Sequence, residues 1–290
     1  MTVLGVVCRP QLPPERLRSV ARAADSSGLE ELWLWEDCFL EGGVSSAAAA
    51  LACTERLRLG IGLMPAPLRN VALAAMEVAT IERMFPGRLL VGVGHGVQDW
   101  MLQVGARVAS PLTLLREYVA AMKQLLAGEE VNTTGRYVQL ERVRLGWPPA
   151  SPPPLLIGAS QPRSLRLSGQ CADGTILTAG TSPHDIRNAC GLIAAGRADA
   201  GNHGRHAVVV YLHAATGPGA LERLARERAR SREDPRLNAG VAGGADVVAA
   251  AVRQWSAAGA TTVVLQPTAD EPDPEGFVRF VAGEVRALSG

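Results

Sequence analysis

The stretch that decides the fold is Gly87-Arg88-Leu89-Leu90-Val91-Gly92-Val93-Gly94-His95-Gly96. Its apolar run, residues 89–93, is preceded by a proline-glycine pair and followed by a glycine-histidine-glycine loop. A short apolar run between turn residues is typical of a strand buried on both faces, as in a parallel sheet. Its glycines predict that the backbone approaches a flat or bulky group at the carboxyl end of the strand. The histidine there lies where α/β proteins hold their chemistry.

Similar apolar runs recur on both sides of this stretch, and segments with helical spacing separate them. Eight strands are predicted, at residues 4–8, 32–35, 57–64, 89–93, 155–159, 174–179, 207–215 and 261–266. Eight alternations of strand and helix with short connections predict a (β/α)8 TIM barrel. An open doubly wound sheet would need a Gly-x-Gly-x-x-Gly turn after the first strand, and the sequence has none there. We therefore expect one barrel domain over residues 1–290.

Two segments depart from the alternation. Residues 131–145 alternate around Gly135 and predict a small hairpin insertion. Residues 238–240, around Asn238, predict a loop before the next helix.

The overall composition restricts the class of protein. The formal net charge is +1, from 29 Lys and Arg against 28 Asp and Glu, which argues against nucleic acid as the main partner. A 47% hydrophobic content can fill a large core. No stretch of apolar residues is long enough for a membrane span, and the N-terminus does not resemble a signal peptide. The five cysteines form no C-x-x-C pair, so we expect a cytoplasmic protein with free thiols and no metal site.

Active sites of barrels lie at the carboxyl ends of the strands, which directs attention to a few polar groups. Glu36 and Asp37 follow the second strand, where a carboxylate can bind a cofactor ring or transfer a proton, or else cap a helix or pair with arginine. His95 is a candidate general acid, or else a loop histidine bound to backbone. The same rule selects Cys8, His213 and Gln266.

The turn at residues 158–163 leads from the fifth strand into a helix. Its backbone amides and the helix N-terminus can bind a phosphate, with Arg163 nearby, although ordinary strand-to-helix turns look the same. No Walker-type Gly-Lys-Ser/Thr is present, so a nucleoside triphosphate is not implied.

Four longer stretches occur in a fixed order: 32–39 (LWLWEDCF), 59–70 (LGIGLMPAPLRN), 86–105 (PGRLLVGVGHGVQDWMLQVG) and 154–180 (PLLIGASQPRSLRLSGQCADGTILTAG). Together they resemble the bacterial luciferase-like superfamily, and specifically its coenzyme F420-dependent oxidoreductases. The resemblance implies a (β/α)8 barrel, usually dimeric, that binds a flavin-type ring at its carboxyl face.

The resemblance also assigns site residues by position. Asp37 matches an acid that contacts the deazaflavin ring, and Leu63-Met64 matches a bulge, often with a non-proline cis peptide, that backs the ring. His95, Asp37 and Glu36 are the candidate proton-transfer groups. The implied cofactor-binding residues are Asp37, Leu63, Met64, His95, Gly96, Gly158, Ala159, Ser160, Gln161, Arg163, Ser164 and Thr178.

Two positions depart from the sugar-phosphate dehydrogenases of this superfamily. Cys38 stands where those enzymes have a histidine, and Val97 stands where they have a glutamate. The acid/base pair of that branch is therefore missing, which argues against oxidation of glucose 6-phosphate.

The resemblance predicts hydride transfer between F420 and a C=C, C=N or C=O bond of a small organic substrate. The alternative is an FMN-dependent two-component monooxygenase on the same barrel. A third possibility is a non-catalytic relative that binds a ligand or dimerises. A homodimer is expected.

Overall fold

The computed structural model describes residues 2–230 and 240–289. Eight parallel strands form a closed barrel, because β8 pairs with β9 and so joins the two ends of the sheet. The barrel strands are β1 (Val3–Val7), β2 (Glu31–Leu34), β3 (Arg58–Pro65), β4 (Leu89–Gly94), β7 (Leu155–Gly158), β8 (Gly174–Leu177), β9 (Ala207–Ala215) and β11 (Thr262–Gln266). The predicted TIM barrel is confirmed, and all eight strands lie where the apolar runs placed them.

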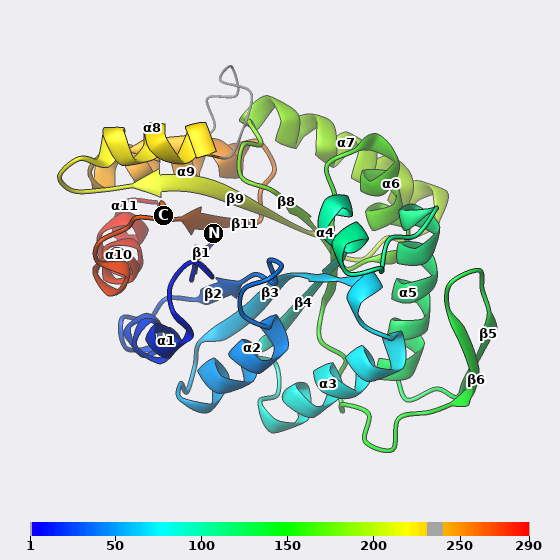
Figure 1. Cartoon of the computed structure of the whole chain (residues 1–290). Coiled ribbons are helices and arrows are strands. Elements are labelled where there is room, and N and C mark those ends of the chain that lie inside the picture. The colour runs from blue at the N-terminus through cyan, green and yellow to red at the C-terminus, as the bar shows by residue number, and fades with distance from the viewer. Residues whose placement is uncertain (1, 231–239, 290) are drawn as a thin grey trace.

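Helices surround the strands and cover the outside of the barrel (Figure 1). They are α1 (Leu17–Ser26), α2 (Gly43–Ala52), α3 (Val71–Met84), α4 (Gln98–Gln103), α5 (Pro111–Leu126), α6 (Pro162–Cys171), α7 (Pro183–Asp199), α8 (Ala220–Arg230), α9 (Ala245–Ala257), α10 (Pro274–Phe280) and α11 (Arg286–Ser289). Several begin with a proline in the first turn, where its missing N–H costs nothing. Their apolar faces and the outward-facing strand residues form one large core.

Two elements lie outside the regular alternation. The strands β5 (Val131–Thr134) and β6 (Gln139–Val143) pair as an antiparallel hairpin that projects from the barrel (Figure 1). A short strand, β10 (Gly240–Ala242), adds to the edge of β9. Most of the loop expected at residues 238–240 lies outside the described residues. In the described part of the chain, no helix is long and apolar enough to span a membrane.

The barrel interior is filled by side chains that alternate with outward-facing ones along each strand. Trp33 is fully buried there, and its indole N–H donates to Glu31 at the amino end of the barrel over 2.9 Å. Tyr211 packs edge-on against Trp33 with ring centres 6.0 Å apart, and Trp35 lies 5.9 Å from Tyr211 on the side of the carboxyl ends. Three aromatic rings therefore form a column beneath the mouth of the barrel.

Two glycines of β3 make room for this column. A Cβ on Gly60 would lie 2.4 Å from the Trp33 ring, and one on Gly62 would lie 2.1 Å from the Tyr211 hydroxyl oxygen. Real Cβ atoms do not approach that closely, so any larger residue at either position would displace the aromatic rings.

Candidate active site

A cavity of about 420 Å³ opens at the carboxyl ends of the strands. Its lining comes from most of the barrel strands and the loops that follow them. The lining residues are Arg9, Trp35, Glu36, Asp37, Gly62, Leu63, Pro65, His95, Gly96, Val97, Trp100, Gly158, Ala159, Ser160, Ile176, Thr178, Ala179, Tyr211, His213, Glu227 and Gln266. The cavity thus brings together nine of the residues that the resemblance assigned to the site.

The wall contributed by β3 is irregular. Its pairing with β4 shifts register between Ile61 and Met64, which is the bulge that the resemblance implied. A non-proline cis peptide joins Gly62 to Leu63, so the expected position one bond later, between Leu63 and Met64, was wrong. A second one joins Cys38 to Phe39. The hydroxyl of Tyr211 donates to the Gly62 carbonyl oxygen over 3.0 Å. This bond crosses the barrel and orients the backbone of the bulge.

Leu63 and Met64 point to opposite sides of this wall. Leu63 fills the space over Gly94 and Gly158, where a Cβ would lie 2.7 and 2.2 Å from its methyl carbons. Met64 is 2% exposed and packs in the outer core, away from the cavity. A ring bound against the bulge would therefore contact Leu63 and the backbone rather than the Met64 side chain.

The two adjacent acids have different surroundings. Both Glu36 oxygens are bound to the Arg69 guanidinium, and one also accepts from the Gly43 amide over 2.9 Å. Asp37 is half-buried and lines the cavity. Burial raises the pKa of the Asp37 carboxyl, and the positive charge of Arg9 opposes this rise. Glu36 thus occupies the arginine-partner role that the sequence left open, whereas Asp37 faces the site.

His95 lies in the loop after β4 and lines the cavity. Its Nδ1 is 2.9 Å from the Gly96 carbonyl oxygen, which orients the ring. The side-chain amide of Gln98 donates to the His95 carbonyl over 3.0 Å and stabilises the same loop.

The turn between β7 and α6 contributes only its first part to the cavity. Gly158, Ala159 and Ser160 line it, but Gln161 and Arg163 are exposed and lie outside the lining. The Ser164 hydroxyl donates to the Gln161 carbonyl over 2.9 Å and is buried in the turn. The structure therefore separates the proposed phosphate-binding residues into a cavity group and a turn group. Thr178 follows β8, the strand next to β7, and also lines the cavity.

Several lining residues were absent from the set nominated by resemblance. The strand-end rule had selected His213 and Gln266 but also Cys8, which packs in the outer core instead. Arg9 was not predicted, although it directly follows Cys8. The alternation of inward and outward residues along β1 would have found it, since Val7 points inward. Trp35, Tyr211 and Glu227 were missed as well.

Cys38 follows Asp37 and does not line the cavity. Burial raises the pKa of its thiol, and the negative charges of Glu36 and Asp37 add to the rise. In the described ranges, no group of three His, Cys, Asp or Glu side chains is arranged to hold a metal ion.

Residues 4–262 match the model of a protein family described as luciferase-like monooxygenase. The chain belongs to this family. A curated relative, the 5,10-methylenetetrahydromethanopterin reductase of Methanolobus tindarius, is 30% identical over 68% of this chain and 60% of its own length. The F420-dependent glucose-6-phosphate dehydrogenase of Nakamurella multipartita is 32% identical over 60% of this chain and 55% of its own length. The matched part thus spans less than two thirds of these relatives.

Several solved structures share the fold over almost the whole chain. The coenzyme F420-dependent tetrahydromethanopterin reductase of Methanopyrus kandleri superposes with a TM-score of 0.86, at 21% identity, over 100% of this chain and 99% of that one. An F420-dependent secondary alcohol dehydrogenase with a bound F420-acetone adduct gives a TM-score of 0.88, at 20% identity, over 99% of both chains. The oxygenating component of a Baeyer-Villiger monooxygenase of Pseudomonas putida, bound to FMN, gives 0.79 at 16% identity over 99% and 98%.

Proposed function

We propose that this chain is an F420-dependent oxidoreductase that transfers a hydride between the deazaflavin and a C=C, C=N or C=O bond of a small organic substrate. The proposal rests on the cofactor, which two relatives with different substrates have in common. The alcohol dehydrogenase structure and the glucose-6-phosphate dehydrogenase both name F420 as cofactor. These two relatives thus share the cofactor and differ in the substrate.

The cavity fits such a cofactor. Its volume of about 420 Å³ falls in the range of roughly 300–1,000 Å³ that is usual for small-molecule sites. The wall at the β3 bulge consists of Gly62 and of the Leu63 side chain, which fills the space left by Gly158. The rings of Trp35 and Tyr211, with centres 5.9 Å apart, supply an aromatic part of the lining.

Different residues of the cavity would bind the cofactor and transfer the proton. The β3 bulge and Leu63 would form one wall of the ring site, and Asp37 would bind the polar edge of the ring. The deazaflavin would supply hydride chemistry at its central ring carbon. His95 faces the cavity and would hold or release the proton that accompanies hydride transfer. Trp35 and Trp100 would limit the access of water to the reacting atoms.

A sugar phosphate is not the substrate that we propose. Cys38 does not line the cavity, and Val97 contributes an apolar surface instead of a carboxylate. Neither side chain supplies the acid or base that the sugar-phosphate branch has at these positions.

An FMN-dependent monooxygenase is the second candidate. It is favoured by the description of the family and by the FMN-bound monooxygenase of the same fold. A flavin reductase would then have to supply reduced FMN from outside the chain.

The deciding measurement is equilibrium binding of F420 and of FMN, side by side, by fluorescence quenching. We expect micromolar or tighter binding of F420, weaker binding of FMN, and a loss of about tenfold or more in F420 affinity for Asp37→Asn, since a charged hydrogen bond is removed. Glu41→Gln is the matched control, because Glu41 is a nearby carboxylate outside the cavity lining.

Each of the other outcomes would change the proposed function or the proposed site. Tight FMN binding with oxygen consumption would replace the proposal with the monooxygenase. Absence of binding by both cofactors would support the non-catalytic relative. Unchanged F420 affinity in Asp37→Asn would remove Asp37 from the cofactor site.

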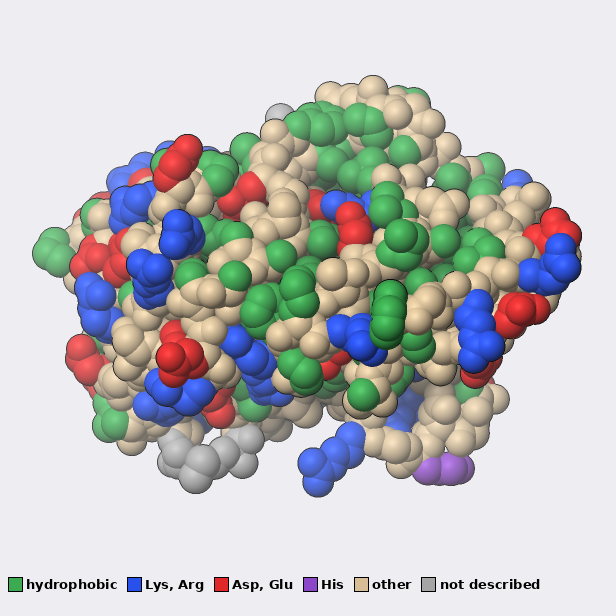
Figure 2. Space-filling model, turned by 90° about the horizontal axis from the view of Figure 1, so that it is seen from below, with side chains coloured by type: hydrophobic (Ala, Val, Ile, Leu, Met, Phe, Trp, Pro, Cys, Tyr) green, Lys and Arg blue, Asp and Glu red, His purple; other side chains and the backbone are tan. Residues whose placement is uncertain are grey.

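We further propose that the enzyme is a cytoplasmic homodimer. The face of α2 and α3, seen in Figure 2, carries hydrophobic side chains across its middle. Leu73, Met76 and Met84 of α3 are 48%, 56% and 55% exposed, and Phe39 is 63% exposed. An apolar surface of this kind on a helical face fits a second copy of the chain.

A further inference from the structure

The walls of the cavity differ in chemistry. Leu63, Pro65, Val97, Trp100 and Ile176 make one part of the lining apolar. The polar part combines Arg9, which follows β1, with His213 of β9, Glu227 of α8 and Gln266 of β11. A substrate between these walls meets hydrocarbon on one side and hydrogen-bonding groups on the other.

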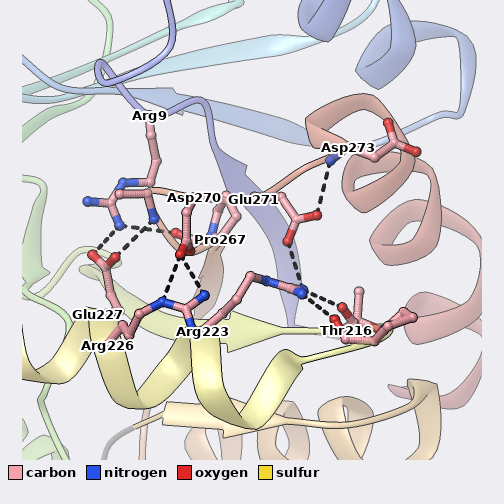
Figure 3. Close-up of polar contacts among 11 residues, drawn as sticks. Arg9, Thr216, Arg223, Arg226, Glu227, Pro267, Asp270, Glu271 and Asp273 are labelled. Carbon is pink, nitrogen blue, oxygen red and sulfur yellow. Dashed lines mark hydrogen bonds and ion pairs between the residues drawn. The ribbon is translucent and has the colours of Figure 1, made fainter.

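Arg9 is the buried cation of the polar wall. Its side chain is 10% exposed. Nε donates to Gln11 over 2.9 Å, and Nη1 donates to Glu227 over 2.5 Å and to the Pro267 carbonyl over 3.1 Å (Figure 3). Nη2 has no hydrogen-bond partner within residues 2–230 and 240–289. Because the Arg9 side chain lines the cavity, Nη2 can donate a hydrogen bond to an acceptor atom of a ligand there.

The position of this guanidinium is fixed by its neighbours. The second oxygen of Glu227 accepts from the Ala269 amide over 2.9 Å. The adjacent Arg226 pairs with Asp270 over 2.9 Å, so α8 is bound to the loop that follows β11 (Figure 3). The Arg9 carbon Cζ also lies 5.4 Å from the centre of the Trp35 ring. A donor held from several sides binds an acceptor with little reorganisation.

The local charges restrict what Arg9 can bind. Glu227 balances the positive charge of Arg9, and Asp37 adds a second carboxylate to the lining. An anionic substrate would meet both carboxylates, and a cationic one would meet the guanidinium. An uncharged oxygen acceptor avoids both repulsions and still accepts a charge-assisted hydrogen bond.

We infer that Arg9 binds the oxygen atom of an uncharged carbonyl substrate, a ketone, aldehyde or enone, at the polar wall of the cavity. The inference rests on the proposed function and narrows its substrate to this class. In the reaction, the carbonyl carbon, or the β-carbon of an enone, accepts a hydride from the reduced deazaflavin, which becomes oxidised. The π electron pair moves toward oxygen, where Arg9 stabilises the developing charge. One proton from water or His95 completes the product.

The test uses four six-membered-ring probes: cyclohexanone, cyclohex-2-enone, cyclohexanecarboxylate and cyclohexylammonium. Binding to the protein without cofactor is measured by saturation-transfer NMR, and turnover is measured with reduced F420. The informative variant is Arg9→Lys, which keeps a positive charge beside Glu227 but removes Nη2, the donor proposed to bind the substrate. Arg226→Gln is the control, since Arg226 lies next to Glu227 on α8, outside the cavity lining.

We expect the two uncharged probes to bind more tightly than the two charged ones. In Arg9→Lys their affinity and kcat/KM should fall by about 10- to 100-fold, while the F420 dissociation constant changes by about twofold or less. Should Arg9→Lys not fold, the double variant Arg9→Gln/Glu227→Gln replaces it, because it removes both charges together.

Wild-type binding and turnover of cyclohexanone and cyclohex-2-enone in Arg9→Lys would overturn the inference, as would preferred binding of cyclohexanecarboxylate. A wild-type protein that binds no F420 but binds the uncharged probes through Arg9 would reject the proposed function and keep the carbonyl site.

Discussion

The hydroxyl of Tyr211 connects two walls of the barrel, because it comes from β9 and donates to the Gly62 carbonyl of β3 over 3.0 Å. The bulge that starts at Gly62 would form the ring site. We predict that Tyr211→Phe weakens F420 binding by about three- to tenfold and shifts the absorption maximum of the bound cofactor, since one hydrogen bond holds the wall in place. The loss in unfolding free energy should be about 1 kcal/mol.

Tyr137→Phe provides the comparison, because the Tyr137 oxygen accepts from the Ser110 amide over 2.8 Å, at the hairpin and away from the cavity. It should lower stability without changing the cofactor spectrum. An unaltered spectrum and F420 affinity in Tyr211→Phe would mean that the bulge keeps its orientation without this bond.

For single residues, the sequence and the resemblance predicted which positions lie at the site, but they did not predict where each side chain points. Position alone placed Leu63 and Met64 together, but the register shift turns one toward the cavity and the other into the core. Ser164 was expected to bind the cofactor, but its hydroxyl donates within its own turn. The alternation along β1 places Arg9 at the cavity, but its pairing with Glu227, more than two hundred residues away in the chain, could not be predicted. Such long-range contacts leave no local signal in the sequence.

At the scale of elements, the exposed stripe on α3 has a testable consequence. Leu73, Met76 and Met84 lie three to eleven residues apart, on one face of the helix. We predict that the double variant Leu73→Lys/Met76→Lys shifts the protein from dimer to monomer in light scattering coupled to size exclusion, because two charges would be buried in the interface. Leu221→Lys is the control, since Leu221 of α8 is 72% exposed on another element. A wild-type monomer, or a variant that stays dimeric, would contradict this interface.

The barrel strands were predictable because each is an apolar run bounded by turn residues, and a strand buried on both faces needs no other signal. Short elements were not. The six-residue α4 has one buried side chain, and the three-residue β10 exists only through its pairing with β9. Elements of this length have little periodicity of their own, so tertiary contacts determine them.

At the scale of the whole molecule, the two ends of the barrel serve different purposes. The carboxyl end holds the cavity, and the amino end holds buried polar contacts that join neighbouring strands. Glu31 pairs there with Arg58 over 2.5 Å. On the other side, the Thr175 hydroxyl lies 2.8 Å from His206 Nε2 and 2.7 Å from the Ser168 hydroxyl. These contacts are far from the proposed chemistry, so they should affect global stability rather than turnover.

His206 makes this stability depend on pH. Burial lowers the pKa of its imidazole to about 4, and the positive charges of Arg197 and Lys123 add to the shift, while Asp173 opposes it. In the unfolded chain the pKa is about 6.5, so between these values the unfolded state binds a proton that the folded state does not. The free energy of unfolding must therefore fall as the pH decreases from 6.5 toward 4.

We predict that part of the stability lost between pH 7 and pH 5, about 1 kcal/mol after allowance for solvent screening, disappears in His206→Gln. Glutamine can still hydrogen-bond to Thr175 but does not titrate. The measurement is urea denaturation at both pH values, for wild type, His206→Gln and His184→Gln, whose histidine is exposed on α7. The His184 variant should follow wild type. Equal pH dependence in wild type and His206→Gln would show that the imidazole is protonated as easily in the folded barrel as in the unfolded chain.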